Sequence, residues 1–149
     1  MIKRLDNKDE RIANLILNVQ IPAYKVEAQI IGFDGIPQLK DTVETITSST
    51  EIFIGYKENK ELKAFLSYTE SESQYQICRL VVHPKFFKQG IAKKLVNYFL
   101  NDIVDQKKII VSTGADNLPA INLYKSSGFI FTKKIEVVPS LYIAFFERV

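Results

Sequence analysis

The sequence has few of the residues that disulfides and metal centres require. It contains one cysteine, Cys78, and one histidine, His83, among 149 residues. A single cysteine cannot form a disulfide within the chain, and this usage fits a protein of the cytoplasm. One cysteine and one histidine are too few for the common zinc sites, and no HExxH motif is present. We therefore expect no metal.

Charge of one sign and long apolar runs are also scarce. The chain has 20 Lys and Arg residues against 17 Asp and Glu residues, a net charge of +3, without any long block of like charges. This weak, dispersed charge predicts no nucleic-acid partner. No segment reaches the roughly 18 apolar residues of a membrane span, and the N-terminal segment lacks the apolar core of a signal peptide. We therefore expect no membrane association.

Several functional motifs are missing as well. The chain has no GxxxxGK[ST] loop, no GxGxxG and no GxSxG. A P-loop, a dinucleotide fingerprint and a hydrolase nucleophile elbow are thus unsupported. No internal repeat, low-complexity tract or linker interrupts the chain, so we expect a single domain over residues 1–149.

Apolar periodicity in the first third predicts mainly helix. The expected elements there are a strand at 2–5, a helix at 6–19, a second helical segment at 23–31, a turn at 32–37 and a short helix at 39–46. Pro22 is expected to end or kink the first helix, because proline lacks the amide proton that a helix interior needs.

Strands predominate in the rest of the chain. The expected elements are a hairpin of 51–57 and 61–70, a strand at 75–82, a helix at 89–105, a strand at 107–113, a helix at 115–129 and strands at 129–137 and 140–149. This order predicts a mixed sheet covered by helices, which is a layered α/β (α+β) domain. The last strand, LYIAFFERV, is apolar and could pair at a dimer edge, so a homodimer is one candidate assembly.

The stretch HPKFFKQGIAKKLV, residues 83–96, follows the apolar run ICRLVV and becomes amphipathic after its glycine. A strand that ends at a proline and leads through a short cationic loop into a helix is one way to build an anion site. The first turn of a helix has free N–H groups and a partial positive charge. In the alternative interpretation, Gly90 only makes a tight turn and the lysines form a solvated face.

A second motif, N-x-P-A-x-x-L-Y-x-x-x-G-F, lies downstream and is spelled by Asn117, Pro119, Ala120, Leu123, Tyr124, Gly128 and Phe129. Together with the loop, it resembles the GNAT superfamily of acetyl-CoA-dependent N-acetyltransferases, whose loop reads [Q/R]-x-x-G-x-[G/A]. This chain departs from that loop at Phe87, where the neighbouring Lys88 could supply the missing cation. The resemblance implies a GNAT-like fold, with a mixed, mostly antiparallel sheet of about seven strands flanked by helices.

The resemblance also implies acetyl-CoA as cosubstrate. Its pantetheine arm would bond to the backbone of Leu80, Val81 and Val82 like an added strand. Its pyrophosphate would face the loop and the helix start, which comprise Phe87, Lys88, Gln89, Gly90, Ile91, Ala92 and Lys93. The small residues there let phosphate oxygens approach the backbone. The Asn117 amide would bond the pantetheine or, alternatively, cap its helix.

The resemblance implies a residue for the general acid but leaves the general base open. Tyr124 matches the family's general acid, which donates a proton or a hydrogen bond to the departing thiolate; alone it would be read as a core tyrosine. Some relatives carry a glutamate near the position of Gln76, which is not a carboxylate here. The base would then be a water relay or a carboxylate of the N-terminal segment. Cys78 could suggest an acyl-cysteine route, but a core cysteine is the favoured interpretation.

The acceptor site is predicted from the N-terminal segment, which the resemblance places over that end of the cleft. It offers Tyr24, Glu27, Phe33 and Asp34, and a carboxylate beside aromatic rings suits an ammonium. Exposed helix and turn residues are the alternative. The implied activity is transfer of an acetyl group to a primary amine by direct attack in a ternary complex. The competing hypothesis is a non-catalytic acyl-CoA-binding sensor or interaction module.

Overall fold

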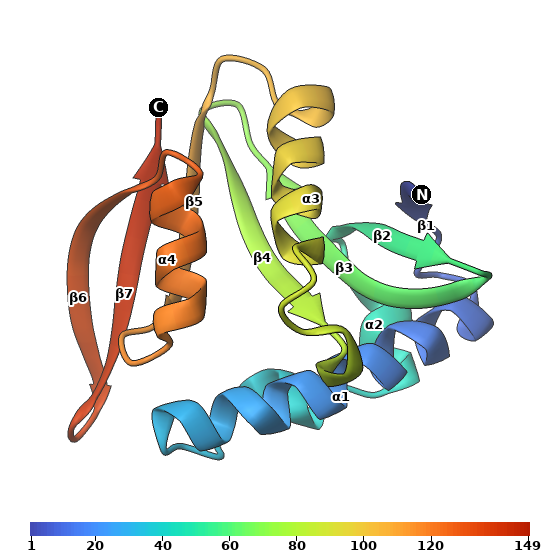
Figure 1. Ribbon diagram of the computed structural model, residues 1–149, viewed down its shortest axis with the longest axis horizontal. Helices are drawn as coiled ribbons and strands as arrows, with labels where there is room; N and C mark the ends of the chain where they lie inside the picture. Colours follow the sequence, from blue (N-terminus) through green and yellow to red (C-terminus); the bar gives the residue numbers. More distant parts are fainter.

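The computed structural model describes all of residues 1–149 as one seven-stranded sheet with helices on both faces (Figure 1). The strands are β1 (Ile2–Leu5), β2 (Ile52–Glu58), β3 (Glu61–Glu70), β4 (Gln74–Val82), β5 (Lys108–Gly114), β6 (Ile130–Val138) and β7 (Leu141–Arg148). The helices are α1 (Glu10–Ile31), α2 (Val43–Ser48), α3 (Ile91–Tyr98) and α4 (Leu118–Ser126). Short helical turns occur at η1 (Pro37–Lys40), η2 (Pro84–Phe86) and η3 (Phe99–Ile103).

The strand order is β1-β2-β3-β4-β5-β7-β6, and every neighbouring pair is antiparallel except β4 and β5. This confirms the predicted mixed, mostly antiparallel sheet of about seven strands. The predicted dimer edge is wrong, because β7 lies inside the sheet between β5 and β6. The two edges belong to β1 and β6.

Helix α1 continues through Pro22, so the predicted end of the helix there is wrong. The Asp9 side chain caps its start by accepting from the Arg11 N–H, and Gly32, with φ of 68°, ends it. Proline removes one hydrogen bond from the helix. Side chains on both sides of Pro22 pack against the sheet: Ile16 and Val19 are buried before it, and the half-buried Tyr24 packs against the same cluster after it. Such packing can outweigh the lost bond, because tertiary contacts supply most of a helix's stability.

Helix α3 is shorter than the predicted 89–105. It begins after Gly90 and is α-helical only to Tyr98, after which the wider turn η3 extends to Ile103. The Val104 N–H donates to the Phe99 carbonyl at 3.1 Å and closes that turn.

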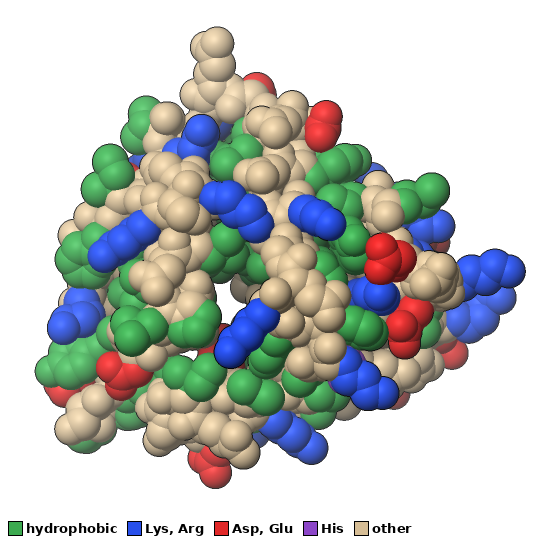
Figure 2. Space-filling model, viewed as in Figure 1, with side chains coloured by type: hydrophobic (Ala, Val, Ile, Leu, Met, Phe, Trp, Pro, Cys, Tyr) green, Lys and Arg blue, Asp and Glu red, His purple; other side chains and the backbone are tan.

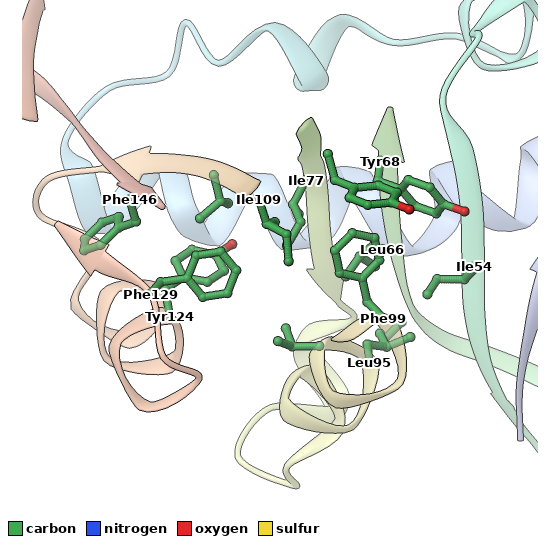
Figure 3. Packing of buried hydrophobic residues seen from close by; sticks show 14 of the residues in the cluster. Ile54, Leu66, Tyr68, Ile77, Leu95, Phe99, Ile109, Tyr124, Phe129 and Phe146 are labelled. Carbon is green, nitrogen blue, oxygen red and sulfur yellow. The ribbon is translucent and has the colours of Figure 1, made fainter. Parts of the chain in front are cut away.

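Two hydrophobic clusters hold the helices on the sheet. The larger cluster lies between the sheet and helices α3 and α4, and it includes Leu66, Leu95, Phe99, Phe129 and Phe146 (Figure 3). The smaller cluster lies on the opposite face and joins Ile16 of α1 and Ile46 of α2 to Phe53, Phe65 and Val81 of the sheet. No helix is long and apolar enough to cross a membrane.

Candidate acyl-donor and acceptor site

The sheet opens between β4 and β5. The two strands are paired at only three positions, where residues 74–76 face residues 108–110, and then diverge (Figure 1). Beyond this point, each strand keeps its outer neighbour and leaves its inner edge without a strand partner. Backbone N–H and C=O groups need partners, so this gap suits an extended ligand that hydrogen-bonds like a strand.

A β-bulge at Cys78 accompanies the opening. Tyr68 of β3 faces Ile77, whereas the next residue, Ser67, faces Arg79, so Cys78 has no opposite residue. A bulge bends its strand and changes which face the following side chains occupy. Arg79 therefore turns toward the α1 side of the sheet, where it contacts residues of α1 and of the segments beside it.

The start of α3 lies beside the gap and has the properties of an anion site. Gly90 has φ of 76° and the preceding Lys88 has φ of 63°, and no side chain caps the helix. The first helical hydrogen bond is the one from the Lys94 N–H to the Gly90 carbonyl at 3.1 Å. The N–H groups of the first turn thus remain available, and a Cβ at Gly90 would meet nothing within 4 Å.

The predicted phosphate-side cations differ in availability. Lys88 and Gln89 are exposed, and Phe87 is 41% exposed at the end of η2. The Lys93 ammonium instead donates to the Ser126 carbonyl at 3.1 Å and to the Ser126 and Ser127 hydroxyls at 3.0 and 3.1 Å. It bridges α3 to the end of α4, so Lys88 is the freer cation of this loop.

The space-filling view agrees with a gap between these helices. Figure 2 shows an opening in the middle of the face that carries α3 and α4, bordered by hydrophobic and basic side chains. The predicted donor-strand residues belong to the part of β4 that no longer pairs with β5. Val81 is buried against α1, whereas Leu80 and Val82 pack toward α3, so contact with a ligand at the gap would fall to their backbone.

Tyr124 of α4 combines a buried ring with a free hydroxyl. The residue is 5% exposed and packs against Phe129 and Phe146, at centroid distances of 5.7 and 6.2 Å. Its hydroxyl points away from Phe146 toward the middle of the sheet (Figure 3) and makes no hydrogen bond within the chain. Burial raises the pKa of this phenol, with a further contribution from the Glu27 carboxylate, so it stays protonated at neutral pH.

Asn117 links the start of α4 to α1. Its carbonyl oxygen accepts from the Ala120 N–H at 3.3 Å, which makes it the helix cap. Its amide donates to Glu27 Oε1 at 3.0 Å and to Thr113 Oγ1 at 3.3 Å. Because both donors are engaged, a pantetheine that bonds this amide would have to replace one of these acceptors.

Glu27 and Tyr24 lie on the inward side of α1. Burial raises the pKa of Glu27, and the hydrogen bond from Asn117 acts in the opposite direction. Burial also raises the pKa of the Tyr24 phenol, as do the nearby Glu27 and Glu51 carboxylates. Tyr24 lies three residues before Glu27 on α1, and Asn117 caps the helix that carries Tyr124. The hydrogen bond between Asn117 and Glu27 thus joins the two helices that carry the predicted tyrosines.

An ion-pair network beside Tyr24 was missed by the sequence prediction. Arg79 Nε and Nη2 donate to the two oxygens of Glu51 at 3.0 and 3.1 Å. Arg79 Nη1 donates to Asp41 Oδ2 at 2.7 Å and to Gln20 Oε1 at 2.9 Å. The charged side chains are 10–18% exposed, and two carboxylates against one guanidinium leave one negative charge. The available signal was an arginine inside the apolar run ICRLVV.

Phe33 and Asp34 lie apart from this cluster. They line a depression of about 670 Å³ with Lys25, Ala28, Gln29, Gly32 and Leu39, on the outward side of α1. The four predicted acceptor residues therefore divide between two places. Glu27 contacts the start of α4 through Asn117, and Tyr24 packs against the cluster between α1 and the sheet.

The other candidates near the base position have structural explanations. Gln76 is exposed at the last position where β4 pairs with β5. Burial raises the pKa of the Cys78 thiol, which keeps it protonated and a poor nucleophile. His83 Nδ1 accepts from the Lys85 N–H at 3.1 Å, which caps the short turn η2 and gives this residue a structural role.

Comparison with known proteins decides the family. The model of the acetyltransferase (GNAT) family matches residues 18–129. The chain belongs to this family. The matched range contains α3 with its preceding loop, the β4–β5 gap and α4.

This GNAT chain is similar to a curated protein in sequence and to solved acetyltransferases in fold. The chain is 42% identical over 147 residues to the UPF0157 protein YqkA of Bacillus subtilis (strain 168), covering 99% of this chain but 43% of YqkA. It thus spans less than half the length of that relative. The ribosomal-protein-S18-alanine N-acetyltransferase of Escherichia coli superposes with a TM-score of 0.77 at 16% identity, over 99% of this chain and 92% of that one. An aminoglycoside 6'-N-acetyltransferase complexed with coenzyme A gives 0.73 at 12% identity, over 99% and 96%.

The raised pKa of Glu27 predicts a pH-dependent effect of its replacement. Between the ordinary pKa and the raised one, the folded state binds more protons than the unfolded state, so ionisation of Glu27 lowers the free energy of unfolding as pH rises. Glu27→Gln removes this charge and can still accept from Asn117. We expect the variant to exceed wild type in stability at pH 8, with the difference fading toward pH 4.

Urea denaturation at the two pH values measures this effect. The exposed Glu72, in the turn between β3 and β4, provides the matched control, and we expect Glu72→Gln to show no such trend. If wild type is instead more stable than Glu27→Gln at pH 8, ionised Glu27 does not lower the free energy of unfolding, and the prediction is wrong.

Proposed function

We propose that residues 1–149 form one acetyltransferase domain that moves the acetyl group of acetyl-CoA to a cationic primary amine. The observation that carries this proposal is the pair of unpaired inner edges of β4 and β5, with the uncapped start of α3 beside them. The family assignment agrees with it. The presence of a single cysteine, which cannot form a disulfide within the chain, suits a cytoplasmic location.

The donor would lie in the gap with its two polar parts on different elements. The pantetheine amides would bond to the free edge of β4 beyond residue 76, in the manner of an added strand. The pyrophosphate would accept from the first N–H groups of α3, with Lys88 as the accessible cation. No rearrangement of Gly90 is needed, since nothing occupies the space in front of it.

Chemistry would follow by direct attack within the ternary complex. The amine nitrogen forms a bond to the thioester carbonyl carbon, and the carbon–sulfur bond breaks with its electron pair leaving on sulfur. A backbone N–H of β4 near Val82 would polarise the carbonyl. The pKa of the Tyr124 phenol is raised, whereas an alkyl thiol such as that of coenzyme A has a pKa of about 8.5. The phenol is therefore the weaker acid of the two. Its favoured role is therefore a hydrogen bond to the thiolate rather than complete proton transfer.

The acceptor side carries excess negative charge. Glu27, Glu51 and Asp41 oppose the single Arg79, and Tyr24 lies among them. Alkyl amines titrate near about 10.4 and arrive as ammonium ions, which these carboxylates would attract. Because burial makes Glu27 more basic, it is the favoured acceptor of the proton that the ammonium must lose.

The rival function is an acyl-CoA-binding module without turnover. The absence of a carboxylate at Gln76 and of Gln or Arg at Phe87 is compatible with it. The free Tyr124 hydroxyl and the nearby Glu27 favour catalysis, because binding alone would need neither. The predictions below separate binding from turnover.

Gly90→Glu should abolish acetyl-CoA binding. A carboxylate side chain would project into the open space before α3 and repel the pyrophosphate. Isothermal calorimetry provides the measurement, and Gly32→Glu provides the matched control. Gly32 has a similar positive φ and equally open surroundings, but it lies at the end of α1. Wild-type affinity in a folded Gly90→Glu variant would remove this loop from the donor site.

Tyr124→Phe should lower kcat by about 10²-fold, the scale of losing one transition-state hydrogen bond, and should leave acetyl-CoA affinity nearly unchanged. The ring contacts with Phe129 and Phe146 would persist. A stopped assay of coenzyme A release and a calorimetric titration report the two quantities. An unchanged kcat would mean that thiolate departure does not depend on this hydroxyl.

Glu27→Gln should raise KM for cationic amines or lower kcat, even though it stabilises the fold. Coenzyme A release with a panel of cationic, neutral and anionic amines provides the test, with Glu72→Gln as the control. Asp34→Asn reports on the outer depression, and we expect it to change KM less. Equal kinetics for wild type and Glu27→Gln with an active amine would leave a solvent water chain as the base.

A further inference from the structure

Strand β6 is an edge strand with an unusual amount of exposed apolar surface. Every residue of β6 is exposed, including Ile130 at 70%, Val137 at 52% and Ile135 at 41%. An edge strand offers unpaired N–H and C=O groups to another strand, and natural proteins usually blunt such edges. Here β6 has nine residues and no proline, and its register shifts near each end leave residues 133–136 regularly paired with β7.

The faces of β6 follow from its pairing with β7. Lys134 lies opposite Ala144, and Glu136 lies opposite Tyr142, so both project to the same face of the sheet. The Lys134 ammonium lies 5.0 Å from the centre of the Tyr142 ring. Glu136 Oε2 accepts from the Ser140 N–H at 3.1 Å, which leaves the other oxygen free. One face of β6 thus carries opposite charges on the two residues that flank Ile135, whose own side chain lies on the other face.

Two-fold symmetry limits how this strand can pair with a copy of itself. When two identical strands pair antiparallel in one sheet, a residue at the symmetry axis faces its own copy. An axis at Lys134 sets lysine against lysine, and an axis at Glu136 sets glutamate against glutamate. An axis at Ile135 sets each Lys134 opposite the partner's Glu136. Like charges directly opposite destabilise a sheet and opposite charges stabilise it. Of these three registers, charge therefore favours the one centred on Ile135, which sets opposite charges against each other.

The other edge strand, β1, carries charges of one sign only. Strand β1 has four residues and carries the neighbouring cations Lys3 and Arg4. Antiparallel pairing of β1 with its own copy would gather four positive charges on two short strands. Of the two edges, β6 is therefore the one whose charges complement themselves.

We propose that β6 pairs with β6 of a second copy of this chain, antiparallel and centred on Ile135, to form a two-fold dimer with one continuous sheet. Two symmetric Lys134–Glu136 pairs fix the register, and the exposed apolar side chains of β6 gain cross-strand neighbours that cover part of their surface. This interface is independent of the proposed acetyl transfer, because it lies at the sheet edge beyond β7, away from the gap.

A charge-swap cycle on the whole chain tests the proposal. Sedimentation velocity over a range of concentrations should show wild type at about twice the 17.1 kDa chain mass. Lys134→Glu alone and Glu136→Lys alone each place like charges opposite one another, and both should shift the protein to monomer. The double variant, Lys134→Glu with Glu136→Lys, restores the opposite-charge pairs and should recover the dimer.

The control is Lys3→Glu, which makes the same charge change on β1 and should leave the dimer intact. Circular dichroism confirms that each variant is folded, since all three sites are exposed. A monomeric wild type at every concentration would overturn the proposal. A dimer that both single variants retain, or that Lys3→Glu dissociates, would overturn it as well.

Discussion

Backbone groups that lack a strand partner between β4 and β5 are the constraint on which the rest of the site depends. The strands share three paired positions and then separate, while each remains paired to its outer neighbour. The bulge at Cys78 bends β4 and turns Arg79 toward α1. A closed sheet would satisfy these groups internally and leave no slot for an extended donor.

The helices stabilise the separated strands from both sides. On one face Lys93 of α3 donates to three oxygen atoms at the end of α4, which connects the helices that flank the gap. On the other face α1 passes beneath the open ends of the strands (Figure 1). Asn117 joins Glu27 of α1 to the start of α4, and a Cβ at Gly114 would lie 2.8 Å from the Ile31 side chain. The acceptor side of the gap is thus built on α1 and carries its negative charge.

Much of this arrangement follows from sequence patterns. The layered mixed sheet, the loop before α3 and the cap of α4 depend on local periodicity and on residues such as Gly90 and Asn117, whose conformational preferences are strong. Continuity of α1 through Pro22 could not be predicted locally, because packing of residues on both sides of the proline, such as Val19 and Tyr24, outweighs one lost hydrogen bond. The Arg79 network joins residues up to 59 positions apart, and the division of Phe33 and Asp34 from Glu27 depends on how α1 is rotated against the sheet.

Hydrogen exchange of backbone amides, read by mass spectrometry with and without acetyl-CoA, tests the central claim most directly. If the donor completes the open edge of β4, protection should rise in residues 77–82 and in the first turn of α3, and stay constant in β1 and β6. Protection that appears instead around the outer depression of α1, or no change along β4, would contradict the assignment of the gap as the donor site.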